Sequence, residues 1–115
     1  MRQEEHNLQV ACVRTFRYKY PDVLIYAIPN GGHRSIKTAS ALKAEGVVSG
    51  VPDLFIAVAR GEYHGCYVEM KNGKKGKLSE NQKERMTQLT KAGYLCLVCH
   101  DFDEFERDTD KYMSL

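Results

Sequence analysis

The sequence predicts an α/β domain in which helices flank a mixed, four-stranded β-sheet. Helical and strand-like runs alternate along its 115 residues, in the order helix, strand, helix, strand, strand, helix, strand, helix. Two of the strand-like runs follow one another across a short connection, which predicts an antiparallel hairpin. Helices separate the other strands and allow parallel neighbours, so the sheet should be mixed. A chain of this length has the size of one domain, and we expect residues 1–115 to form it.

The first half of the chain supplies an amphipathic helix, a β-branched and aromatic strand, and a helix rich in Ala, Leu and Lys. These three elements cover residues 4–20, 23–28 and 35–45. In the first helix the apolar side chains recur at helical spacing: Leu8, Ala11, Cys12 and Phe16. Pro21 ends this helix, a Pro-Asn-Gly-Gly turn follows the strand, and Gly46 ends the second helix.

The second half supplies the hairpin, a helix, a strand and a last helix. These elements cover residues 53–58, 65–71, 79–92, 94–99 and 103–113. Residues 60–64, which include Gly61, are short enough to connect the two hairpin strands. A loop of Gly and Lys residues follows the second hairpin strand, and Ser79 and Gly93 bound the next helix.

Composition and charge are those of an ordinary globular protein, with 43% hydrophobic and 28% charged residues. The net charge is only +2, so an argument for a polyanionic partner has to come from the positions of the charges. The first residues are too polar for a signal peptide, and no apolar run approaches the roughly 18 residues that cross a bilayer. We therefore expect a cytoplasmic protein with no membrane partner.

Cys96 and Cys99 form a C-x-x-C-H pattern with His100, which by itself suggests haem attachment, a redox pair or a zinc site. The pattern lies within a strand-like run, where alternation sends residues three positions apart to opposite faces. No second cysteine pair is present to complete a zinc site. We expect free thiols that pack in the core.

Glu69 and Lys71 carry opposite charges on one face of a strand, roughly 6–7 Å apart. Asp53 opens the partner strand of the hairpin, so antiparallel pairing brings Asp53 and Glu69 to the same end of the sheet. Two crowded carboxylates repel each other unless a cation lies between them, and oxygen ligands favour Mg²⁺ or Mn²⁺. Lys71 could then orient or deprotonate a water nucleophile. The alternative is a solvated Glu–Lys pair and a turn aspartate, neither with a role in chemistry.

Five short motifs resemble, in the same order, those of the VRR-NUC branch of the PD-(D/E)XK nuclease superfamily: PNGGHR, ALKAEG, GVPDL, VEMK and LSENQ, at residues 29–34, 41–46, 50–54, 68–71 and 78–82. The resemblance implies a restriction-endonuclease-like core and a metal-dependent endonuclease that hydrolyses phosphodiester bonds of DNA. Small standalone members are similar to phage and bacterial enzymes that cut branched or four-way (Holliday) junction DNA as homodimers. By position, Asp53, Glu69 and the backbone carbonyl of Met70 resemble the metal ligands, and Lys71 resembles the catalytic lysine.

The same resemblance places a glutamate of the first helix at the metal, and Glu4 and Glu5 are both available. They flank the apolar stripe on opposite sides, so helical periodicity does not choose between them. The spacing of Glu5 to Leu8 is closer to the family pattern, and we expect Glu5. Gln82 has two interpretations: it is the N3 residue of a capping box opened by Ser79, and by the same resemblance it is a catalytic-site residue close to the lysine or a phosphate.

Two polar segments are candidates for binding DNA. Lys74, Lys75 and Lys77 lie on the Gly-rich loop beside the acids and could follow a phosphate backbone, although a merely solvated loop is the alternative. Asn30 and Arg34 lie in the turn before the second helix, where His33 is an exposed turn residue rather than a ligand. No pattern suggests contacts to base edges, so we expect recognition of DNA shape. A non-catalytic nucleic-acid-binding domain that retains the nuclease fold is the competing hypothesis.

Overall fold

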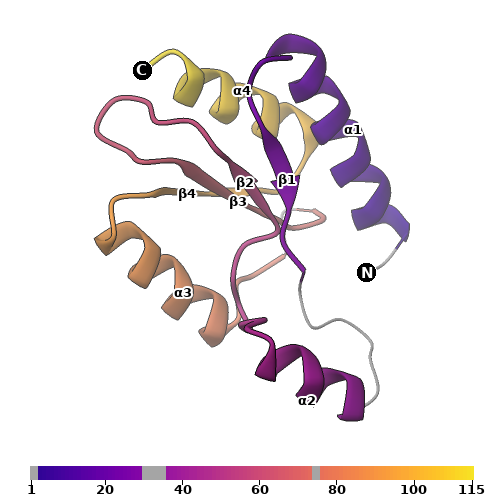
Figure 1. Ribbon diagram of the computed structural model, residues 1–115. Coiled ribbons are helices and arrows are strands. Elements are labelled where there is room, and N and C mark those ends of the chain that lie inside the picture. Colours follow the sequence, from indigo (N-terminus) through magenta and orange to yellow (C-terminus); the bar gives the residue numbers. More distant parts are fainter. Residues whose placement is uncertain (1–2, 30–35, 74–75) are drawn as a thin grey trace.

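Helices and strands follow one another in the predicted order in a computed structural model that describes residues 3–29, 36–73 and 76–115 (Figure 1). The helices are α1 (Gln3–Lys19), α2 (Ile36–Ala44), α3 (Glu80–Lys91) and α4 (Phe102–Met113). The strands are β1 (Ile25–Ala27), β2 (Leu54–Ile56), β3 (Cys66–Met70) and β4 (Leu95–Cys99).

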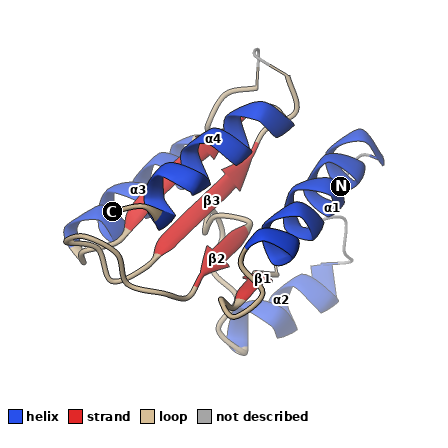
Figure 2. Ribbon diagram, turned by 90° about the horizontal axis from the view of Figure 1, so that it is seen from above, coloured by secondary structure: helices blue, strands red, loops and turns tan. Residues whose placement is uncertain are grey.

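The four strands form one mixed sheet in the order β1-β2-β3-β4. β2 pairs antiparallel with both β1 and β3, whereas β3 and β4 run parallel. Helices α1 and α4 lie together on one side of the sheet, and α3 lies on the other side against β4 (Figures 1 and 2). The α/β class and the mixed sheet flanked by helices, both predicted from the order of elements, are confirmed.

The core lies between the sheet and the pair α1 and α4. Its inward side chains come from every strand and from both helices: Cys12, Phe16, Ile25, Leu54, Ile56, Cys66, Val68, Met70, Cys99, Phe105 and Tyr112. Fully burying a side chain such as Phe16 or Phe105 contributes about 1.5–3 kcal/mol. The opposite face of the sheet carries the remaining alternate residues of β2 and β3, and among them is Glu69.

Strands β1 and β2 are shorter than predicted, because the sequence suggested residues 23–28 and 53–58. Val23 is taken up by a turn in which its N–H donates to the carbonyl of Tyr20. The pairing nevertheless extends one residue beyond each strand, since the Ala57 N–H donates to Leu24 and the Ile28 N–H to Asp53. The predicted strands are therefore correct in place but too long at both ends.

Local signals at helix ends are confirmed. Ser79 accepts a hydrogen bond from the Gln82 N–H, and the Gln82 side chain accepts one from the Ser79 N–H, which completes the capping box. Gly46 and Gly93 adopt positive φ angles of 109° and 97° after α2 and α3, which a residue with a Cβ adopts only with strain.

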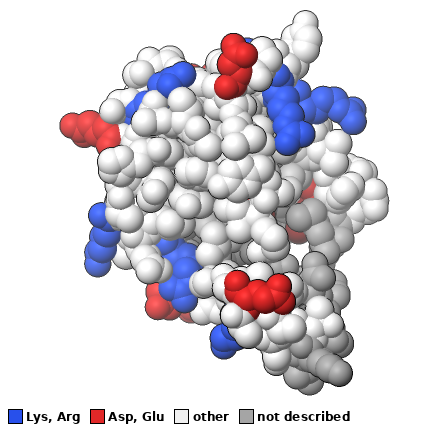
Figure 3. Space-filling model, viewed as in Figure 1, with Lys and Arg blue, Asp and Glu red and all other residues white. Residues whose placement is uncertain are grey.

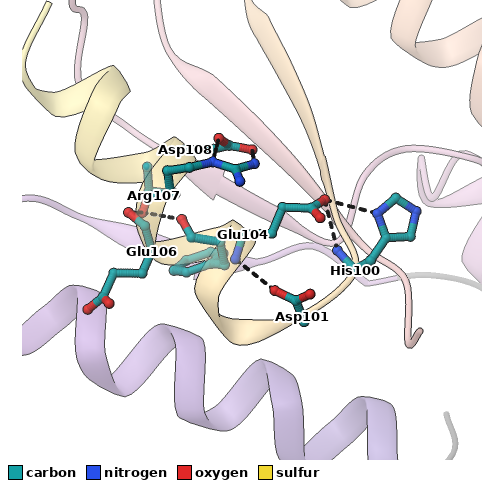
Figure 4. A network of polar contacts seen from close by, with 8 residues as sticks. His100, Asp101, Glu104, Glu106, Arg107 and Asp108 are labelled. Carbon is teal, nitrogen blue, oxygen red and sulfur yellow. Dashed lines mark hydrogen bonds and ion pairs between the residues drawn. The ribbon is translucent and has the colours of Figure 1, made fainter. Parts of the chain in front are cut away.

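Helix α4 begins at a small polar network (Figure 4). The Asp101 carboxylate accepts a 2.8 Å hydrogen bond from the Glu104 N–H, as an N-cap residue does. Glu104 reaches back to His100, with its Oε1 atom 2.9 Å from the ring Nδ1 atom. At the other end of the helix, the Tyr112 hydroxyl donates a 2.6 Å hydrogen bond to the Val58 carbonyl. These contacts fix α4 against the sheet at both ends.

All four cysteines are free thiols, as predicted. Burial raises the pKa of the Cys99 thiol to about 12, so the thiol stays protonated and unreactive. Among residues 3–29, 36–73 and 76–115, none of the helices combines the length and the apolar character that a membrane span requires.

Candidate active site

The two predicted acids meet because of the register of the hairpin. Leu54 pairs with Val68, so the preceding residue, Asp53, lies across from the following one, Glu69. Both side chains are buried, with exposed fractions of 7% for Asp53 and 3% for Glu69. The Met70 N–H donates a 2.8 Å hydrogen bond to Asp53 Oδ2, which holds this carboxylate at the end of β3.

Glu69 has one oxygen engaged and one without a partner. Gln82 Nε2 donates a hydrogen bond to Oε2 over 3.2 Å, and Lys71 Nζ lies 4.0 Å from the same oxygen. Oε1 is buried and accepts no hydrogen bond from the described part of the chain. Burial first, and then the negative charge of Asp53, raises the pKa of Glu69 to about 8, whereas Lys71 opposes this shift. Without a cation, Glu69 is therefore mainly protonated at neutral pH.

Gln82 takes part in the helix cap and contacts the acid pair at the same time. Its side-chain oxygen completes the capping box, while its amide nitrogen contacts a carboxylate of the site. The acid that it contacts is Glu69, and contact with the lysine or with a phosphate, which the resemblance suggests, stays a prediction. The start of α3 thus positions one oxygen of Glu69 through a single side chain.

The two candidate glutamates of α1 have different surroundings. Glu5 lines the same pocket as Asp53 and Glu69. Glu4 instead accepts a 2.9 Å hydrogen bond from Asn72 Nδ2, on the segment that follows β3. Glu5 is therefore the glutamate that faces the acids, and Glu4 fastens α1 to that segment.

The Lys71 segment is fastened to the beginning of α4. The Lys71 N–H donates to the Cys99 carbonyl over 2.9 Å, and the Gly73 N–H donates to the His100 carbonyl over 3.1 Å. His100 is itself bound by Glu104, so the network of Figure 4 supports the backbone beside the site. The Lys71 side chain, 19% exposed, lies at the wall of the pocket.

The acids form one wall of a pocket of about 930 Å³ between α2, α3 and the end of β3. Two cations that sequence reasoning missed, Lys43 of α2 and Arg85 of α3, also line it. Arg85 is held in place, since its Nε atom donates to the Ser49 carbonyl over 3.2 Å. The sequence contained a signal for Arg85, because a residue three positions after Gln82 lies on the same face of the helix as Gln82.

Most of the predicted DNA-binding residues lie outside the described residues: Asn30, Arg34, Lys74 and Lys75, together with His33. Lys77 is exposed and does not line the pocket. On the face shown in Figure 3, basic and acidic side chains are interspersed around the periphery, and neither sign forms a continuous field.

The site fits a hard divalent cation. Its donors are carboxylate oxygens, and the buried Glu69 Oε1 lacks the hydrogen bond that a buried oxygen normally has. Within residues 3–29, 36–73 and 76–115, no three His, Cys, Asp or Glu side chains come close enough to form a complete protein site. Mg²⁺ does not need one, because it commonly binds one or two carboxylates and keeps several waters.

A mixed sheet between helices, with a buried Asp–Glu pair beside a lysine, is consistent with the PD-(D/E)XK class of nuclease domains. The family model of the VRR-NUC domain matches residues 3–102. The chain therefore belongs to the VRR-NUC family, and its function is of the nuclease type, with DNA as the class of substrate.

Solved structures of VRR_NUC domain proteins are similar to this chain. A VRR_NUC domain protein is 27% identical with a TM-score of 0.82, and the match covers 100% of this chain and 92% of that one. A second structure, a VRR_NUC domain, is 20% identical with a TM-score of 0.65 over 96% of this chain and 99% of that one, which shows a shared fold. No curated protein matches the chain significantly.

Proposed function

We infer that the protein is a Mg²⁺- or Mn²⁺-dependent endonuclease that hydrolyses phosphodiester bonds of DNA. The observation that carries this proposal is the buried pair of Asp53 and Glu69, in which Glu69 Oε1 has no hydrogen-bond partner among the described residues. Such an oxygen is costly to bury unless a ligand satisfies it. Asp53, Glu69, the Met70 carbonyl and Glu5 are the proposed ligands of the cation.

The residues around the acids suggest how the reaction is organised. The Met70 N–H orients Asp53, and Gln82 orients Glu69, so both carboxylates are fixed before substrate binds. A bound divalent cation would neutralise charge on the scissile phosphate and ease deprotonation of the attacking water. Lys71, 4.0 Å from Glu69, is the group that orients this water and exchanges a proton with it.

The cations near the site supply contacts to the DNA backbone. Arg85 and Lys43 line the pocket and are proposed to hold the phosphates that flank the scissile bond. The remaining proposed phosphate contacts are Asn30, Arg34, Lys74, Lys75 and Lys77. Phosphate contacts position DNA without reading its sequence, which favours selectivity for DNA shape.

We further propose that the substrate is branched DNA, including the four-way junction, cut by a homodimer in the cytoplasm of a bacterial or phage-infected cell. A twofold axis relates two identical active sites, and this symmetry suits two nicks placed symmetrically in a junction. Resemblance to the small standalone members of the family supports the dimer and the branched substrate.

The test is a metal titration on end-labelled four-way junction and linear duplex DNA. Wild-type protein should cleave in Mn²⁺ or Mg²⁺ and not in EDTA, and Glu69→Gln and Lys71→Met should each lower the rate at least about 100-fold. Glu80→Gln and Lys83→Met are matched controls, because both side chains are exposed on α3, and they should cleave like wild type. Binding without cleavage in every metal would favour the non-catalytic DNA-binding domain instead.

A further inference from the structure

Four aromatic rings form a row across one face of the sheet. The register pairs Tyr26 of β1 with Phe55 of β2, and Phe55 with Tyr67 of β3. Their ring centroids are 5.8 Å and 4.5 Å apart along the row. Tyr94, just before β4, completes it at 5.9 Å from Phe55 and 5.4 Å from Tyr67. We call these four residues the aromatic row.

The aromatic row does not belong to the core. Tyr26 is 42% exposed, and the other three rings are half-buried. The hydroxyls of Tyr26, Tyr67 and Tyr94 donate no hydrogen bond to any described residue. The structural tyrosines behave differently, since Tyr20 and Tyr112 donate theirs to Asp110 and to the Val58 carbonyl. The row therefore presents ring surface and polar tips that the described chain leaves unused, a combination typical of binding surfaces.

The aromatic row lies next to the proposed active site on the same face of the sheet. Asp53 and Phe55 are two positions apart in β2 and its entry, and Tyr67 and Glu69 are two positions apart in β3. Alternation places each pair on one face, with about 6–7 Å between neighbouring rows. The hairpin thus sets an aromatic cross-strand pair directly beside the acid pair.

We propose that the aromatic row stacks unpaired bases of the DNA strand whose phosphate is cut at the acid pair; this rests on the proposed function. Ring faces accept any base, so the row would hold a single strand without regard to sequence. The acids, Lys71 and Arg85 contact the phosphate. The uncharged aromatic row, two positions along each hairpin strand from the acids, contacts the bases on the same face. Stacked bases of an intact duplex cannot reach half-buried rings, so the occupant is an unpaired segment at a branch or flap.

The chain has seven tyrosines and no tryptophan, so its intrinsic fluorescence reports on tyrosine alone. Wild-type protein in EDTA is titrated with a labelled single-stranded oligothymidylate, and affinity is followed by anisotropy and by quenching of tyrosine fluorescence. Metal-free conditions separate this binding from any cleavage. We expect binding with quenching for wild type, and roughly 5- to 100-fold weaker binding for Tyr26→Leu, the magnitude of losing one base–ring contact.

Two matched variants make the result specific. Tyr18→Leu removes a tyrosine that is 87% exposed on α1, the helix that packs against the opposite face of the sheet, and should bind like wild type. Tyr67→Phe keeps the ring and should retain affinity within about twofold, because stacking needs the ring face rather than the hydroxyl. Thermal unfolding of each variant verifies that the fold is intact.

Three outcomes would overturn the inference. In the first, the wild type binds no oligothymidylate, and in the second, the Tyr26→Leu and Tyr18→Leu variants bind it with equal affinity. In the third outcome, Tyr26→Leu dissociates a dimer while its affinity for oligothymidylate stays unchanged. The last outcome, followed by sedimentation velocity, would assign the row to contact between two copies of the chain. The proposed function fails separately, if wild type does not cut branched DNA in Mn²⁺ while Tyr26-dependent binding in EDTA persists.

Discussion

Gly50 lies where the chain approaches α3 most closely, and replacing it tests how the site is held together. Its φ angle is +87°, and a Cβ at this position would lie 2.6 Å from the carbonyl carbon and oxygen of Asn81. It would also lie 3.0 Å from the Gln82 nitrogen. Since these are backbone atoms at the start of α3, Gly50→Ala must displace either the turn or the helix.

The cost of Gly50→Ala has two parts. The left-handed conformation costs a residue with a Cβ about 1–2 kcal/mol. Overpacking against fixed backbone adds about 1–3 kcal/mol. Gly46→Ala is the matched control, because Gly46 has a φ of +109° and nothing lies within 4 Å of its Cβ position. Both variants lose the same unfolded-chain entropy, so their difference isolates the overpacking.

Differential scanning calorimetry measures this difference. For a domain of this size, 1 kcal/mol shifts Tm by about 3–6 °C, so Gly50→Ala should melt about 3–18 °C below Gly46→Ala. A displaced helix would also move Gln82, whose hydrogen bond to Glu69 is already 3.2 Å long and would be weakened by further separation. Equal melting temperatures for the two alanine variants would refute the reasoning, since they would show that the approach of Gly50 to α3 imposes no constraint.

Two further predictions concern stability. Burial first, and then the charge of Asp53, raise the pKa of Glu69 to about 8, so the folded metal-free protein keeps a proton that the unfolded chain releases near pH 4.3. The Tm of the wild type in EDTA should therefore fall as pH rises from about 5 to 8. Glu69→Gln should lack the part of this fall that comes from Glu69, and parallel Tm–pH curves for wild type and Glu69→Gln would contradict the prediction. Tyr112→Phe removes the 2.6 Å hydrogen bond to the Val58 carbonyl and should lower the free energy of unfolding in urea by about 1–2 kcal/mol, whereas the exposed Tyr18→Phe should change it little.

Features that depend on neighbouring residues could be predicted from the sequence. The capping box at Ser79 and the helix ends at Gly46 and Gly93 follow from local hydrogen bonding and backbone conformation. The meeting of Asp53 and Glu69 was also predictable, although the two are distant in sequence. Antiparallel pairing of two consecutive strands brings the start of one beside the end of the other, although the connection, residues 57–65, is longer than predicted.

Other parts of the site depend on contacts between distant segments. Helical periodicity does not distinguish Glu4 from Glu5. The tertiary structure does, because Glu4 accepts a hydrogen bond from Asn72 and Glu5 lines the pocket. Arg85 shares a helix face with Gln82, but the hydrogen bond that holds it to the Ser49 carbonyl, across more than thirty positions, is encoded by no local pattern. These placements follow from how α1, α2 and α3 pack, which the sequence pattern does not specify.

By itself, the sequence determined the order of the elements, the helix caps, the family and the two acids that face each other, because each of these is set by local patterning or by the antiparallel pairing of consecutive strands. The tertiary structure decided which glutamate turns to the acids, which oxygen of Glu69 stays without a partner, and which aromatic rings lie beside them. The physical reason is that side chains from separate strands and helices become neighbours only through sheet order and helix packing, and both arise from the fold as a whole.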